Sequence, residues 1–299
     1  MEIVSFYQVS KVLKKMINNT YWLNNLFHSF IDSSDINIVF EEKEKLKNTQ
    51  KVLNLSIHPL RFADDIFFNF ETNDDELKDK IKKYEVNYDI FYSYADIVKA
   101  TYLKTVKKNT IKENSLLLIG QTERDKVIFD GSRYLSLLDY IEEIKNISND
   151  YETVYFKPHP YAKNNKQIFR ALKNESLNLE IIYDNIYHLL SNDNIKHIVG
   201  LNSSVLYEAK YFRKEATFLF EHIFDIGGKD IGVYGDYWSS AFWSDILDIE
   251  DKHIALPFFP NRLRKSLNDF WGYNEISDEI ILKDIFKSKI KYFLNRYIR

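Results

Sequence analysis

From residue 114 onward, short apolar runs alternate with segments in which apolar residues recur every three or four positions. The runs "SLLLI", "TVYF", "LEIIY", "IKHIVG" and "EATFLF" predict buried strands. The segments between them, "SRYLSLLDYIEEIKNI", "NKQIFRALKN", "NIYHLLSN" and "VLYEAKYF", predict helices. This alternation is typical of a parallel sheet with helices on both faces, so the expected fold class is α/β. Ligands of such sheets bind beyond the carboxyl ends of the strands.

The first part of the chain has a different pattern. The spacing of apolar residues predicts an amphipathic helix over residues 10–31, short strands at 36–40 and 52–57, and a solvated helix within 71–86. All eight glycines lie at Gly120 or later, so this part has no glycine-rich phosphate loop. The two parts of the chain are therefore expected to do different work.

Composition and charge exclude several classes of site. The 299 residues contain no cysteine, which rules out disulfides, a thiol nucleophile and a cysteine-ligated metal. A net charge of −3 gives no bulk attraction to nucleic acid. No apolar run reaches the roughly 18–20 residues that span a bilayer, and no secretory signal begins the chain, so we expect a cytoplasmic protein. Since no histidine spacing or D-x-D strand end suggests ligands, we expect no metal.

Two of the predicted strand ends carry candidate catalytic residues. Gly120 ends the first strand, and Gln121 and Asp125 follow in "GQTERD". A carboxylate there can be a nucleophile, a general base or only a helix cap. In "FKPHP", prolines on both sides restrict the backbone, so that His159 and Pro160 form a rigid turn. A histidine held in this way can donate to a phosphate oxygen, and a purely structural turn is the alternative.

The third motif is "GLNSSVLYEA". Ser203 and Ser204 stand where a helix begins, where hydroxyls and free backbone N–H groups favour an anion. Glu208 follows about one turn later and can reach a sugar hydroxyl. An ordinary serine N-cap is the alternative. At successive strand ends of one sheet, the three motifs predict a site for a nucleotide phosphate and its attached sugar.

These residues also resemble a known group of enzymes. "FKPHP" followed by "NSSVLYEA" is similar to the HP and serine motifs of bacterial GT-B glycosyltransferases that use CMP-activated acidic sugars. Two branches share the motifs, the inverting sialyltransferases and the retaining β-Kdo transferases of capsule and lipopolysaccharide synthesis. The spacing of Gln121, Asp125 and Gly131 is most like the Kdo branch. The sialyltransferase branch has two acidic residues before a glycine, whereas this chain has only Asp130 in "FDG".

The resemblance implies a GT-B-like fold of two Rossmann-like domains with parallel sheets and a reduced N-terminal domain. Residues 1–113 would form the acceptor-side domain, and 114–275 the nucleotide-sugar-binding domain. Residues 276–299 would form a helix that packs back on the first domain. The last segment, "KDIFKSKIKYFLNRYIR", is basic and amphipathic, so peripheral contact with the anionic inner membrane is a second expectation.

The same resemblance implies roles for individual residues. The Asp125 carboxylate would be the nucleophile of a retaining Kdo transfer, oriented by Gln121. In an inverting enzyme Asp125 or Asp130 would instead be the base. The residues expected to bind the CMP portion of the donor are Lys157, His159, Pro160, Ser203, Ser204 and Glu208, with His159 stabilising charge as CMP leaves.

The implied substrates are CMP-Kdo or CMP-sialic acid and an oligosaccharide or lipid-linked glycan acceptor, without metal or other cofactor. The expected function is Kdo transfer in bacterial surface polysaccharide synthesis. Two alternatives stay open: an inverting sialyltransferase, and a non-catalytic nucleotide-binding protein on the same sheet, which fold alone does not exclude.

Overall fold

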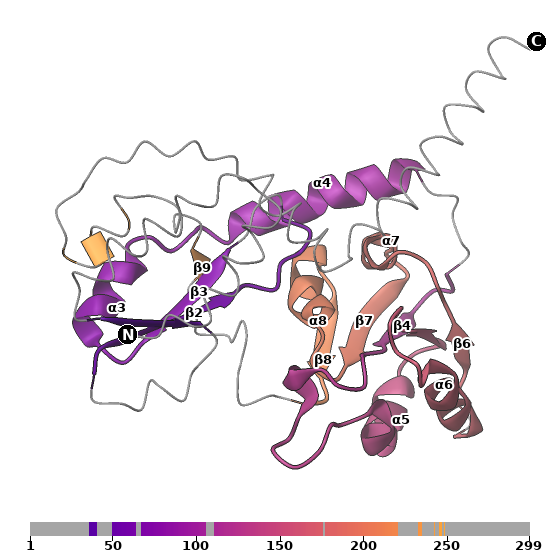
Figure 1. Cartoon of the computed structure of the whole chain (residues 1–299). Helices are drawn as coiled ribbons and strands as arrows, with labels where there is room; N and C mark the ends of the chain where they lie inside the picture. Colours follow the sequence, from indigo (N-terminus) through magenta and orange to yellow (C-terminus); the bar gives the residue numbers. More distant parts are fainter. Residues whose placement is uncertain are drawn as a thin grey trace, which may run out of the picture. The chain divides into compact units, whose positions relative to one another are not determined.

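A computed structural model describes the greater part of the chain (Figure 1). The described residues are 36–40, 50–63, 67–105, 111–175, 177–220, 233–234, 242, 245–246 and 248. The chain divides into two compact units. One comprises Met1–Tyr88 with Ile226–Ile276, and the other comprises Asp89–Asp225 with Ser277–Arg299. This division does not test the domain boundaries expected from sequence, after residues 113 and 275, which stay a prediction.

The second unit contains a five-stranded sheet in the order β6-β5-β4-β7-β8, and every neighbouring pair is parallel. This confirms the α/β class and the Rossmann-like parallel sheet expected from the alternating pattern. The middle strands β4 and β5 are almost completely buried, as strands covered on both faces must be. The strands are β4 (Ser115–Ile119), β5 (Thr153–Lys157), β6 (Leu179–Ile181), β7 (Ile195–Gly200) and β8 (Glu215–Phe218).

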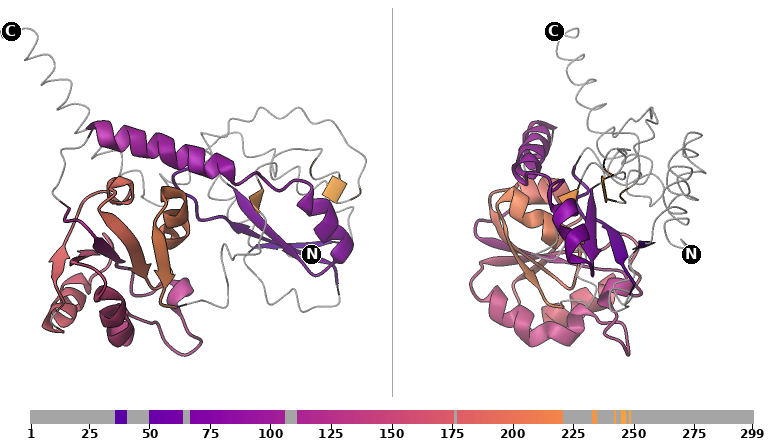
Figure 2. Two further views of the ribbon diagram at one scale, coloured as in Figure 1. Left: turned by 180° about the vertical axis from the view of Figure 1, so that it is seen from behind. Right: turned by 90° about the vertical axis from the view of Figure 1, so that its left-hand side faces the viewer.

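Helices cover both faces of this sheet, with α5 and α6 on one face and α7 and α8 on the other (Figures 1 and 2). Leu116 and Leu118 of β4 belong to the core under α5 and α6, together with Ile144 and Leu172 of those helices. The elements are α4 (Asp89–Thr105), η2 (Lys126–Ile128), η3 (Leu137–Tyr140), α5 (Ile141–Ser148), α6 (Asn165–Asn174), α7 (Ile186–Ser191), α8 (Ser204–Ala209) and η4 (Lys210–Phe212).

The segment "SRYLSLLDYIEEIKNI" is the clearest local difference from the sequence expectation. A single helix was expected, but a short 3-10 turn, η3, precedes α5. Ser136 and Asp139 form a reciprocal capping box at this point, which fixes a helix start several residues later than the apolar spacing suggests.

The first unit contains a second sheet with the order β1-β2-β3-β9. Strands β1 and β2 are parallel, whereas β3 is antiparallel to both β2 and β9. The described sheet is therefore mixed, and the expectation of a parallel sheet in this part was wrong because β3 follows β2 directly and returns beside it. The elements are β1 (Asn37–Phe40), β2 (Val52–Ile57), β3 (Phe68–Thr72), β9 (Val233–Tyr234) and α3 (Asp75–Lys82).

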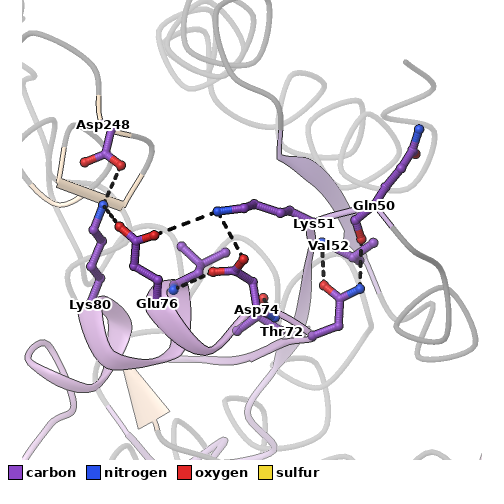
Figure 3. A network of polar contacts seen from close by, with 10 residues as sticks. Gln50, Lys51, Val52, Thr72, Asp74, Glu76, Lys80 and Asp248 are labelled. Atoms are coloured by element: carbon purple, nitrogen blue, oxygen red, sulfur yellow. Dashed lines mark hydrogen bonds and ion pairs between the residues drawn. The ribbon is translucent and has the colours of Figure 1, made fainter.

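Helix α3 begins at a strong polar cap (Figure 3). The Asp74 carboxylate accepts a hydrogen bond of 2.9 Å from the Leu77 N–H and lies 3.0 Å from the Lys51 ammonium. These two contacts lower the pKa of Asp74, the hydrogen bond from Leu77 being the larger cause. The helix expected within 71–86 is confirmed together with its capping start.

Several sequence expectations lie outside the described residues. They are the helix over 10–31, the C-terminal helix over 276–299 and its membrane contact. Within the described part of the chain, no helix has the length and apolar character needed to cross a membrane.

Candidate functional site

Three strands of the parallel sheet end at the same level. Ile119, the last residue of β4, pairs with Lys157 at the end of β5 and with Gly200 at the end of β7. The chain runs outward from β4 to β6 and returns through β7, so the strand order reverses between β4 and β7. Such a reversal opens a crevice at the carboxyl ends of the strands, and this is where α/β proteins bind ligands.

Gly120 allows the loops after β4 and β5 to approach closely. Its N–H donates to the Lys157 carbonyl at 2.9 Å. A Cβ atom at this position would lie 2.9 Å from the His159 backbone nitrogen and 3.2 Å from the Lys157 carbonyl oxygen. Both neighbours are backbone atoms and have little freedom to move, so the position requires glycine for reasons of space.

The "PHPY" segment forms the rigid turn expected from its prolines. The Ala162 N–H donates to the His159 carbonyl at 3.1 Å, which places Pro160 at the second position of a β-turn. The Tyr161 N–H donates to His159 Nδ1 at 3.2 Å. In the neutral imidazole the proton therefore sits on Nε2, which makes this nitrogen a hydrogen-bond donor.

Lys157 places a cation at the end of β5. Its ammonium donates to the Asp184 carbonyl at 2.7 Å, in the loop that follows β6. Burial lowers the pKa of Lys157 to about 8, and the Asp184 carboxylate only partly offsets this effect. A half-buried ammonium of this kind is well suited to an anionic ligand, because a bound anion compensates the lost hydration.

Gln121 joins the loops after β4 and β7 across the point of strand reversal. Its amide nitrogen donates to the Asn202 carbonyl at 3.3 Å, and its amide oxygen accepts from the Asn202 N–H at 3.2 Å. The same nitrogen lies 3.4 Å from an Asp125 carboxylate oxygen. The structure thus brings Gln121 and Asp125 together and connects Gln121 to the loop that precedes Ser203.

Asp125 and Asp130 have different surroundings, although both cap short turns. Asp125 directly precedes η2 and accepts from the Val127 N–H at 3.2 Å, with its second oxygen facing Gln121. Asp130 Oδ1 accepts from the Ser132 N–H, the Ser132 hydroxyl and the Arg133 N–H at 2.7–2.8 Å. These bonds, with that from Arg133 first, lower the pKa of Asp130 to about 2, which makes it a weak base. Gly131 has φ +103°, so it supports the same turn.

The serine motif begins α8 as expected. The Ser203 hydroxyl caps the helix by accepting from the Val205 N–H at 3.4 Å, and Ser204 is its first residue. Glu208 lies on this helix but is only 1% exposed. The Tyr187 hydroxyl of α7 donates to the Glu208 carboxylate at 3.2 Å. Tyr187 was not expected from sequence, where nothing marks "NIYHLL" as more than a helix.

Glu123 is a second residue that the sequence alone did not single out, although it lies between Gln121 and Asp125. Its Oε1 accepts from the N–H groups of Lys163 and Asn164, at 2.6 and 2.8 Å. Hydrogen bonds lower its pKa against the effect of burial, first from its own N–H and then from those of Asn164 and Lys163.

The described contacts thus connect the β4 loop to both neighbouring loops. Gln121 reaches Asn202, Glu123 reaches the start of α6, and Gly120 lies against the turn that carries His159. Among the residues that the structure describes, no three histidine or carboxylate side chains are grouped so that they could hold a metal ion. The chemistry that this arrangement supports is recognition of an anion beside a carboxylate.

Among the comparisons with known proteins, a family match points in the same direction. The model of a protein family described as alpha-2,8-polysialyltransferase matches residues 16–222, more than half of the chain. No curated protein matches the chain. One similar solved structure is that of Thermosulfurimonas dismutans KpsC, beta Kdo 2,7 transferase, at 14% identity and a TM-score of 0.40. That similarity covers 82% of this chain and 79% of the other, and at this distance it assigns no activity.

Proposed function

The chain belongs to the alpha-2,8-polysialyltransferase family, and on that premise we propose that it transfers sialic acid from CMP-sialic acid to a glycan. The strand-end motifs and the family both support a CMP-sugar-dependent glycosyltransferase. The single observation that carries the choice of sialic acid is the family match over residues 16–222.

The donor of such a reaction carries two anionic groups, the CMP phosphate and the sugar carboxylate. Ser203 and Ser204 are proposed to contact the phosphate, and Lys157 to contact an anionic oxygen from the β5 side. His159 and Pro160 form the turn between them, with His159 Nε2–H donating to the phosphate as CMP leaves. Glu208 is proposed to accept a hydrogen bond from a ribose hydroxyl of CMP. That bond would replace the one that Glu208 accepts from the Tyr187 hydroxyl.

In an inverting transfer, the acceptor hydroxyl oxygen attacks the anomeric carbon while the bond from that carbon to the phosphate oxygen breaks. A base takes the hydroxyl proton, and CMP leaves with the bonding electrons. Asp125 is the proposed base, because the hydrogen bonds that hold Asp130 ionised down to about pH 2 make Asp130 a poor proton acceptor. His159 stabilises the phosphate charge, a contribution of about 3–4 kcal/mol for one well-placed donor.

A second candidate is the retaining transfer of Kdo from CMP-Kdo, and the contact between Gln121 and Asp125 favours it. The Gln121 amide lies 3.4 Å from the Asp125 carboxylate, so it could orient a nucleophilic oxygen. In that reaction Asp125 would displace CMP, and the acceptor hydroxyl would then displace Asp125. Two inversions give net retention.

The acceptor is proposed to be an oligosaccharide or a lipid-linked glycan of bacterial capsule synthesis, with the enzyme in the cytoplasm and peripheral contact to the inner membrane. The reaction as proposed needs no metal. The alternative of a non-catalytic nucleotide-binding protein predicts that CMP is not released in the presence of any acceptor.

The experiment that tests the proposal supplies CMP-sialic acid and CMP-Kdo separately, each with an oligosialic acid acceptor and with a Kdo-terminated acceptor. Mass spectrometry of the acceptor then identifies which sugar is added. Intact-protein mass spectra of wild type and Asp125→Ala, taken in parallel, detect a covalent adduct. Sialyl transfer without an adduct supports the first candidate. A Kdo-sized adduct that Asp125→Ala abolishes would replace it with the second.

A further inference from the structure

The N-terminus of α6 is capped by a residue from a distant part of the chain. Asn164, the N-cap residue, makes no capping hydrogen bond with its own side chain. Glu123 Oε1 instead accepts from the N–H groups of Lys163 and Asn164, 40 and 41 residues away. A carboxylate at a helix N-terminus is stabilised both by these N–H groups and by the helix dipole.

The residues held by this cap directly precede an amide that fixes the turn of His159. Asn165, the first residue of α6, donates from its side-chain nitrogen to the His159 carbonyl at 2.8 Å and to the Ala162 carbonyl at 2.9 Å. The N–H groups held by Glu123 and the amide that fixes the turn are therefore consecutive in the chain. A displacement of Glu123 would shift the start of α6, and with it the His159 turn.

The β4 loop is fixed on its other side as well. Two residues before Glu123, Gln121 exchanges two hydrogen bonds with the backbone of Asn202, and two residues after it lies Asp125. Asp125 and His159 stand on different loops. Glu123 provides a side-chain link between those loops through the N–H groups of Lys163 and Asn164.

We propose that Glu123 is a positioning residue of the transfer reaction. By capping α6 from the β4 loop, it sets the distance between the Asp125 carboxylate and the His159 imidazole. This inference rests on the proposed function. Catalysis is sensitive to such distances, because a displacement of about 1 Å at reacting groups can lower a rate by about 100-fold.

The test compares three variants of the 299-residue chain. Glu123→Ala removes both accepted hydrogen bonds, whereas Glu123→Gln keeps an oxygen that can accept them but removes the charge. Asp74→Ala is the matched control. The Asp74 carboxylate also caps a helix, but Asp74 belongs to the first unit and is not part of the proposed site. Asp74→Ala should lower the melting temperature by about as much as Glu123→Ala does.

Glu123→Ala should lower kcat by at least tenfold with less than a threefold change in donor KM, and Glu123→Gln should recover part of the loss. Asp74→Ala should keep its kcat. Amide hydrogen exchange provides a second readout: the N–H groups of Lys163 and Asn164 should exchange at least tenfold faster in Glu123→Ala than in wild type.

An unchanged kcat in Glu123→Ala would overturn the inference, as would an equal fall in Asp74→Ala, which would make the effect one of stability alone. If Glu123→Ala does not fold, a Glu123→Gln variant in which the N–H groups of Lys163 and Asn164 exchange faster than in wild type while kcat stays at the wild-type value decides against the inference. Absence of transfer by the wild-type protein would instead overturn the proposed function, while the exchange rates would still show whether Glu123 holds α6.

Discussion

Substitution of Gly120 by alanine should damage both the stability and the activity of the second unit. The added Cβ would lie 2.9 Å from the His159 nitrogen and 3.2 Å from the Lys157 carbonyl oxygen, and both are backbone atoms at the centre of the site. Real Cβ atoms essentially never approach another atom to less than 3.0 Å, so the β5 loop must move. Neither Gly120 nor Gly200 has a positive φ, so backbone strain does not add to this steric effect.

The size of the effect follows from overpacking. Inserting a methyl group into a closely packed site costs about 1–3 kcal/mol. For a unit of this size, about 2 kcal/mol lowers the melting temperature by roughly 4–8 °C. The displaced loop carries His159, and kcat should therefore fall by at least tenfold, because the proposed donor to the leaving phosphate would no longer lie in the same position.

Gly200→Ala is the matched control, since Gly200 ends the neighbouring strand β7. A Cβ there would lie 3.4 Å from the Ile119 Cβ and 3.5 Å from the Ile119 carbonyl oxygen, close to ordinary van der Waals contact. This variant should keep its activity and match wild type or gain up to about 1 kcal/mol in stability, since alanine restricts the unfolded chain. Thermal unfolding and initial rates of CMP release measure both effects. Equal behaviour of the two variants would refute the steric reasoning.

Three further predictions concern polar residues of the site. Lys157→Met should raise the donor KM by at least tenfold and yet stabilise the fold by about 2 kcal/mol at pH 7. The lowered pKa of Lys157 means that burying its charged form costs about 3 kcal/mol of folding free energy. Losing the hydrogen bond to the Asp184 carbonyl offsets about 1 kcal/mol of that gain. Below about pH 8 this cost is fully present, and it disappears as pH rises toward the usual pKa of lysine. The extra stability of the variant, measured by urea unfolding, should therefore shrink over this pH range. A variant less stable than wild type at pH 7 would contradict the lowered pKa of Lys157. Gln121→Glu keeps the oxygen that accepts from Asn202 but replaces the donor, so kcat should fall at least tenfold while circular dichroism stays native; wild-type kcat would argue against the link between the loops. Asp130→Asn should lower the melting temperature above the usual pKa range of aspartate. The difference from wild type should shrink as pH falls through about 2, because the carboxylate of the folded protein then becomes protonated; a difference at pH 2 as large as that at neutral pH would exclude this cause.

The pattern of apolar residues predicted the second unit well, because buried strands of a parallel sheet read as continuous apolar runs. Strand β5 and helix α6 lie where "TVYF" and "NKQIFRALKN" indicated. Helix α4 and strand β3 were not expected. In α4, aromatic and β-branched residues such as Phe91, Tyr92 and Ile97 occur on several sides of the helix, so no single apolar stripe marks it.

The candidate site was predictable only in part. Strand ends of a parallel sheet meet at one edge, which is why Gln121, His159 and Ser203 could be assigned to one region from their places in the sequence. The contacts that fix this region join residues 41 and 81 positions apart, Glu123 with Asn164 and Gln121 with Asn202. Local patterns contain no signal for such pairs. The mixed pairing in the first unit was missed because strand β3 itself was not expected.

The central claim is that the edge formed by β4, β5 and β7 releases CMP from an activated acidic sugar with the help of His159. The most direct measurement is the steady-state rate of CMP release from CMP-sialic acid, with an oligosialic acid acceptor, by wild type and His159→Ala. We predict acceptor-dependent release by wild type and a kcat at least 100-fold lower in the variant, with a much smaller change in donor KM. Equal kcat values in the two proteins would contradict the claim.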